Sequence, residues 1–142
     1  MVRKVPICFL TFSLLLLCSA CAQPGGAGSD PSEPAVVTIG EEEAGKTITL
    51  AAGDRLVISL PANPGTGYTW EMQPAPDESI LKLVDEPQFR AQDPNKVGAP
   101  GLLSFTYDAL SPGETSLTLV YHRAWETGVP PLETYDLTVV VK

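Results

Sequence analysis

The segment Asn63-Pro64-Gly65-Thr66-Gly67-Tyr68 interrupts an alternating apolar pattern with residues that form rigid, exposed turns. Pro64 fixes its own φ near about −65° and biases Asn63 towards extended conformations. Gly65 and Gly67 can adopt positive φ at little steric cost. A pre-organised loop of this kind loses little entropy on binding, which predicts a small polar tip that enters a groove of another molecule. Taken alone, the loop is more typical of a tight turn between two strands that binds nothing.

A second candidate for binding is Arg123-Ala124-Trp125, directly after another alternating run. A tryptophan at the centre of an interface is a common energetic anchor, and its truncation costs about 2 kcal/mol or more. The alternative is that Trp125 is a half-buried packing residue and Arg123 a solvated charge at the end of a strand.

Residues that could support catalysis or metal binding are scarce. His122 is the only histidine, and it lies in a strand pattern that turns it away from the face of Leu117 and Tyr121. A nucleophilic site needs a base and a group that orients it, and a zinc site needs several nitrogen or sulfur ligands. The acidic run at residues 41–43 could bind calcium weakly, but it is more typical of a solvated turn. We therefore predict no enzyme activity, no metal site and no cofactor.

Residues 1–20 have the pattern of an export signal. Arg3 and Lys4 precede an apolar run, residues 7–17, that is too short to span a bilayer comfortably. Leu17-Cys18-Ser19-Ala20-Cys21 resembles the lipobox of bacterial lipoproteins, with Cys18 where the usual pattern has leucine. We expect cleavage before Cys21, lipidation of Cys21 and attachment to the bacterial cell envelope. Secretion as a soluble or periplasmic protein is the alternative.

The mature chain is predicted to have two parts. Residues 21–34 are rich in glycine and proline, which suits a flexible tether, and residues 35–142 form the folded domain. Loss of Arg3 and Lys4 reduces nine basic residues to seven, against 17 acidic ones. This excess of acids disfavours binding to nucleic acid or to anionic membranes, so we expect a protein partner and membrane contact only through Cys21. The domain has no cysteine for a disulfide, and we expect it to be a monomer.

Period-two alternation of apolar residues dominates the domain and predicts β-strands throughout. Turn-forming residues separate the runs, and no segment shows a convincing helical period. Seven to eight short strands without helical crossovers indicate an all-β, antiparallel sandwich. The alternating runs fall at residues 37–39, 48–50, 56–60, 68–72, 81–83, 103–109, 117–121 and 135–141.

Loops distant in sequence can gather at one end of such a sandwich. Besides the two segments described first, a third unusual connector, residues 93–101, carries Gly98-Ala99-Pro100-Gly101. In order along the chain, these three segments resemble the motifs of the chagasin-like inhibitors of papain-family cysteine proteases, which read N-P-T-T-G-[YF], G-x-G-G and R-P-W. The resemblance extends from about Val36 to Val141.

The resemblance implies an immunoglobulin-like sandwich that places the three loops side by side and reversibly occludes the cleft of a papain-like protease. It places Thr66 nearest the catalytic cysteine, Trp125 on an aromatic rim with Arg123 beside it, and the second loop on the opposite wall. The implied protease-binding residues are Asn63, Pro64, Gly65, Thr66, Gly67, Tyr68, Gly98, Ala99, Pro100, Gly101, Arg123, Ala124 and Trp125.

Three positions depart from the family motifs. Gly65 replaces a threonine, Pro100 replaces a glycine and Ala124 replaces a proline, and each change could alter affinity or the preferred protease. The alternative function is a non-inhibitory β-sandwich lipoprotein, an adhesion or envelope-assembly module that keeps the loops only as scaffold.

Overall fold

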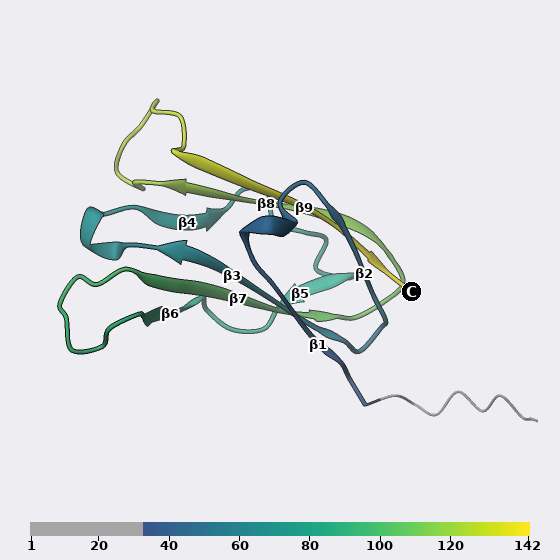
Figure 1. The fold of residues 1–142 in the computed structure, drawn as a ribbon. Coiled ribbons are helices and arrows are strands. Elements are labelled where there is room, and N and C mark those ends of the chain that lie inside the picture. Colours follow the sequence, from purple (N-terminus) through teal and green to yellow (C-terminus); the bar gives the residue numbers. More distant parts are fainter. Residues whose placement is uncertain (1–32) are drawn as a thin grey trace, which may run out of the picture. The chain divides into compact units, whose positions relative to one another are not determined.

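Nine β-strands and two single-turn 3₁₀ helices make up residues 33–142, the part of the chain that the computed structural model describes (Figure 1). The expected signal peptide, the lipid site at Cys21 and most of the tether lie outside the described residues. The elements are β1 (Val36–Ile39), η1 (Glu41–Glu43), β2 (Thr47–Leu50), β3 (Arg55–Ala62), η2 (Pro64–Thr66), β4 (Thr69–Met72), β5 (Leu81–Leu83), β6 (Gln88–Ala91), β7 (Gly101–Ala109), β8 (Gly113–His122) and β9 (Glu133–Val141).

The strands form two sheets. One sheet has the order β1-β3-β7-β5, with β6 also pairing to β7, and the other has the order β2-β9-β8-β4. Alternate residues of the long strands point between the sheets, where Leu60, Phe105, Leu119 and Val139 are at most 2 % exposed. Every strand and this core lie between residues 36 and 141, so a fragment of residues 29–142 contains the complete fold.

The all-β sandwich predicted from the sequence is confirmed, with two differences in detail. The structure has nine strands rather than seven to eight, because β6 was not predicted. The apolar alternation of β6 is limited to Phe89 and Ala91, and three of its four side chains are exposed, so its pattern is too short and too weakly buried to mark a strand. The sheets are also not wholly antiparallel, since β1 pairs with β3 and β2 with β9 in parallel. The connection from β1 to β3 passes through η1 and β2, which makes it long enough for a parallel crossover.

Strand register brings three connections to one end of the sandwich. In one sheet, Ala62 at the end of β3 pairs with Gly101 at the start of β7, which also pairs with Ala91 at the end of β6. In the other sheet, Thr69 at the start of β4 pairs with His122 at the end of β8. We call the three connections loop 1 (residues 63–68), loop 2 (residues 92–100) and loop 3 (residues 123–132). Figure 1 shows all three at the end opposite to the entry into β1.

No helix within residues 33–142 has the length and apolar character needed to cross a membrane.

Candidate functional site

Loop 1 crosses from one sheet to the other and is held in a single 3₁₀ turn by its own hydrogen bonds. The backbone N–H and the hydroxyl of Thr66 both donate to the carbonyl oxygen of Asn63, at 3.0 and 2.7 Å. The N–H of Gly67 donates to the carbonyl oxygen of Pro64 at 3.0 Å. Gly67 then ends the turn in the left-handed region, at φ 80°. Asn63 contributes through its backbone, since its buried Oδ1 has no hydrogen-bond partner.

Aromatic residues of β4 and β8 pack beneath loop 1, on its side towards the core. The N–H of Asn63 donates to the hydroxyl of Tyr121 at 3.1 Å, and the ring of Tyr121 lies 5.4 Å from that of Tyr68. Trp70 is 5 % exposed and its indole N–H donates to the carbonyl oxygen of Pro61 at 2.8 Å, so it belongs to the core. The supporting role of Tyr121 was not predicted, because strand alternation marks it only as an inward-facing residue.

Arg123 ties loop 3 to loop 1. Its Nε donates to the carbonyl oxygen of Thr66 at 3.2 Å, and its Cζ lies 4.4 Å from the centre of the Tyr68 ring, a cation–π distance. Its Nη1 is 3.0 Å from Oε1 of Glu126. The family resemblance implies that the Arg123 guanidinium contacts a protease, but in this structure most of its contacts are with residues of the protein itself. Glu126 was missed at the sequence level, although its spacing of three residues from Arg123 was a usable signal.

Trp125 lies against loop 1 and is nevertheless 68 % exposed. A Cβ built on Gly67 would overlap Cη2 of Trp125 and lie 2.9 Å from its Cζ2, so the indole ring rests directly on this glycine. Thr66 and Ala124 are exposed beside it. The first and third motifs therefore meet at one tip.

Loop 2 approaches loop 1 from the other side through two glycines. A Cβ built on Gly65 would lie 3.3 Å from the carbonyl oxygen of Gly98, which is itself exposed with φ 72°. A threonine at position 65, as in the family motif, would therefore require Gly98 to move. The three segments form one contiguous surface, which we call the loop surface: loops 1 and 2 with residues 123–125.

Two residues of the second motif, Ala99 and Gly101, support the fold instead of being exposed. Ala99 is only 5 % exposed. A Cβ on Gly101 would overlap the carbonyl oxygen of Arg90 and lie 2.8 Å from Cα of Ala91, so Gly101 permits the close pairing of β6 with β7. Only Gly98 and Pro100 of this motif are exposed, whereas Ala99 and Gly101, which the resemblance also implies as protease-binding residues, are not. The four-residue pattern alone could not separate the exposed from the buried positions.

His122 is paired with a carboxylate on the outer face of the sheet. Its Nε2 lies 2.6 Å from Oε2 of Glu71 on β4, and this hydrogen bond lowers the pKa of Glu71. This contact is a cross-strand hydrogen bond between side chains and includes no nucleophile. Within residues 33–142, no group of three or more His, Cys, Asp or Glu side chains is arranged to hold a metal ion.

Residues 49–139 match the family model described as Chagasin family peptidase inhibitor I42. Chagasin of Trypanosoma cruzi is 32 % identical over 102 residues, which cover 69 % of this chain and 89 % of chagasin. Amoebiasin-2 of Entamoeba histolytica is 29 % identical over 108 residues, covering 76 % of this chain and 87 % of the relative.

The solved structures agree with this match. The crystal structure of the cysteine protease inhibitor EhICP2 from Entamoeba histolytica superimposes with a TM-score of 0.66 at 28 % identity, covering 76 % of this chain and 96 % of EhICP2. This likeness confirms the immunoglobulin-like sandwich. The matched family consists of inhibitors, which confirms the prediction that the chain is not an enzyme. Because residues 49–139 match the family model and the chain is 32 % identical to chagasin, this chain belongs to the chagasin family of peptidase inhibitors.

Proposed function

We propose that this protein is a reversible inhibitor of papain-like cysteine endopeptidases and that its loop surface fills the active-site cleft. The observation that carries the proposal is the contiguity of the three motifs, with Thr66 exposed at the centre and Trp125 exposed beside it. A protruding loop surface with an exposed tryptophan is complementary in shape to a narrow active-site cleft. Its conformation is fixed by internal hydrogen bonds before binding, which reduces the entropy lost on association.

The hydrogen bonding of loop 1 explains how it could occupy a protease site without being cut. Thiolate attack requires a carbonyl group whose oxygen moves into the enzyme's oxyanion hole. The carbonyl oxygens of Asn63 and Pro64 accept from N–H groups of the same turn, and that of Thr66 accepts from Arg123. The loop's own hydrogen bonds hold these oxygens in place, which opposes their movement into an oxyanion hole.

The departures from the family motifs have compensating features in this structure. The Arg123–Glu126 pair and the hydrogen bond from the N–H of Glu126 to the carbonyl oxygen of Arg123, at 3.0 Å, fix the start of loop 3 where the family has a proline. Gly65 allows the close approach of Gly98. We therefore expect Ala124 and Gly65 to be compatible with a formed loop surface.

Titration of active papain with the 29–142 fragment tests the proposal. We expect reversible loss of activity at one inhibitor per enzyme, as for a monomeric inhibitor, and an intact fragment by mass spectrometry after prolonged incubation. Full residual activity at micromolar excess of the fragment would contradict inhibition. Cleavage between residues 63 and 68 would show instead that loop 1 is a substrate.

We also propose that the protein is exported and anchored to the cell envelope through Cys21. Val36 pairs with Arg55 at the start of β3, whereas loop 1 follows Ala62 at its end. The eight residues of β3 span roughly 25 Å. A tether that enters at Val36 would thus leave the loop surface facing away from the membrane, where a protease could reach it.

Substitution Cys21→Ser in the full-length protein tests the anchor. We expect the native protein in the membrane fraction and the variant in the soluble fraction of the exporting cell, because thioether-linked acylation requires the thiol. Retention of the variant in the membrane after removal of residues 1–20, checked by the mass of the protein, would rule out Cys21 as the attachment point.

A further inference from the structure

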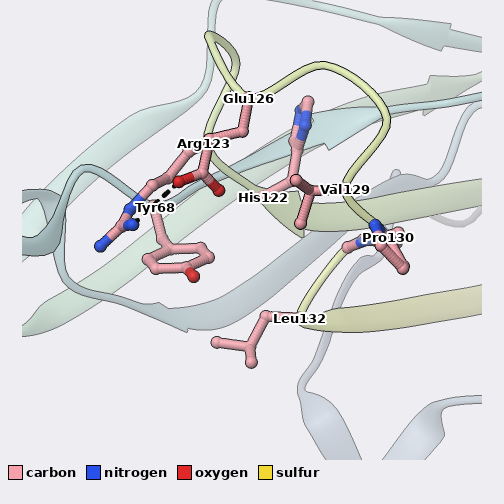
Figure 2. Close-up of a pocket in the computed structure, with 8 residues that line it drawn as sticks. Tyr68, His122, Arg123, Glu126, Val129, Pro130 and Leu132 are labelled. Carbon is pink, nitrogen blue, oxygen red and sulfur yellow. Dashed lines mark hydrogen bonds and ion pairs between the residues drawn. The ribbon is translucent and has the colours of Figure 1, made fainter.

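A pocket of about 280 Å³ lies beside the loop surface, between the end of loop 1 and the second half of loop 3 (Figure 2). Tyr68 and Arg123 form one side, and residues 129–132 form the other. Its volume is sufficient for one leucine- or phenylalanine-sized side chain. None of the three family motifs includes residues 129–132, so the resemblance implies no role for this part of loop 3.

The pocket suits an apolar, uncharged group. Its walls include the Tyr68 ring and the side chains of Val129, Pro130 and Leu132, of which Val129 is 57 % and Leu132 61 % exposed. The charged groups at its edge are already paired. Arg123 is paired with Glu126 at 3.0 Å, and His122 with Glu71 at 2.6 Å. Because each of these groups already has a partner, the pocket has no unpaired charge on its lining that would favour a charged ligand.

Loop 3 holds this pocket in a defined shape. Pro130 and Pro131 restrict the backbone, and the N–H of Leu132 donates to the carbonyl oxygen of Tyr121 at 2.8 Å, which closes the loop onto β8. Apolar side chains exposed on a rigid loop lose little conformational freedom when a partner covers them.

We propose that this pocket is a subsite for one aliphatic or aromatic side chain on the rim of the target protease's cleft, and that Val129 and Leu132 help to determine which proteases are inhibited. The inference rests on the proposed inhibitory function. The pocket is continuous with the loop surface, because Tyr68 and Arg123 belong to both and Trp125 projects from the same loop. A protease seated on loop 1 and Trp125 would therefore have its rim beside the pocket. Rim side chains vary among proteases more freely than the catalytic groups do, which makes the contact selective.

The double variant Val129→Ser/Leu132→Ser in the 29–142 fragment tests the subsite. Inhibition constants are measured for papain, a cathepsin L-type and a cathepsin B-type endopeptidase, together with the melting temperature. We expect the constant to rise by about tenfold against at least one enzyme, and by unequal factors across the three, because burial of two aliphatic side chains is lost. Both residues are more than half exposed, so the melting temperature should stay near that of the native fragment.

The matched control is Val36→Ser/Leu110→Ser, which removes two exposed aliphatic side chains, 64 % and 49 % exposed, at the far end of the sandwich. The control should leave all three inhibition constants unchanged. Equal inhibition by the native fragment and the loop 3 variant, or an equal loss in the control, would overturn the subsite while leaving the inhibitory function intact. Failure of the native fragment to inhibit any of the three would instead remove the proposed function and the subsite with it.

Discussion

Replacement of Trp125 with alanine should raise the inhibition constant for papain by about 30-fold or more while the melting temperature stays nearly unchanged. The expected loss corresponds to about 2 kcal/mol, which is typical of a central aromatic anchor. Trp125 is 68 % exposed in the free protein, so its truncation removes little burial from the fold. Inhibition assays and thermal unfolding of the same preparation measure the two quantities together.

Leu110→Ala is the control for Trp125→Ala, because Leu110 is 49 % exposed and follows β7 at the end away from the loop surface. It should change neither the inhibition constant nor the melting temperature. If Trp125→Ala unfolds the domain, the indole is a structural residue. If the variant inhibits papain as well as the native fragment does, Trp125 does not contact the protease.

Replacement of Gly67 with alanine should weaken papain inhibition by about tenfold or more, because it disturbs the turn and the tryptophan together. The φ of Gly67 is 80°, a conformation that costs an L-residue about 1–2 kcal/mol. The new methyl group would also overlap Cη2 of Trp125 and displace the indole from loop 1. The inhibition constant should therefore rise more than strain alone would produce.

Gly45→Ala separates the effect of backbone strain from the effect of displacing Trp125. Gly45 has φ 75° and no atom within 4 Å of its hypothetical Cβ, so alanine there introduces comparable strain without touching the loop surface. Both variants should lose some thermal stability, but only Gly67→Ala should lose inhibition. Equal inhibition constants for the two variants would show that the contact between Gly67 and Trp125 has no part in binding.

The strands were largely predictable because they alternate burial along their length. Leu56, Ile58 and Leu60 are fully buried, as the period-two pattern of β3 indicated. β6 escaped prediction because it pairs only at the edge of the sheet and buries almost nothing. The parallel pairing of β1 with β3 also could not be read from local residues, since strand direction depends on how η1 and β2 route the chain.

The meeting of the loops could be predicted only through the resemblance of the motifs, since no local pattern fixes the distance between Thr66 and Trp125. The hydrogen bonds and the burial of individual loop residues depend on tertiary contacts. The hydrogen bond from Arg123 to the Thr66 carbonyl joins residues 57 positions apart, and the burial of Ala99 is set by packing of loop 2 rather than by its own sequence. The pocket beside loop 3 likewise exists only because Tyr68 lies opposite residues 129–132.

Calorimetric titration of the 29–142 fragment into papain and, in parallel, into papain whose cleft is filled by a covalently bound peptidyl inhibitor tests whether the three loops enter the protease cleft together. We expect saturable one-to-one binding to the free enzyme and no measurable binding to the filled one. Equal binding to both forms would place the contact outside the cleft and contradict entry of the loops into it.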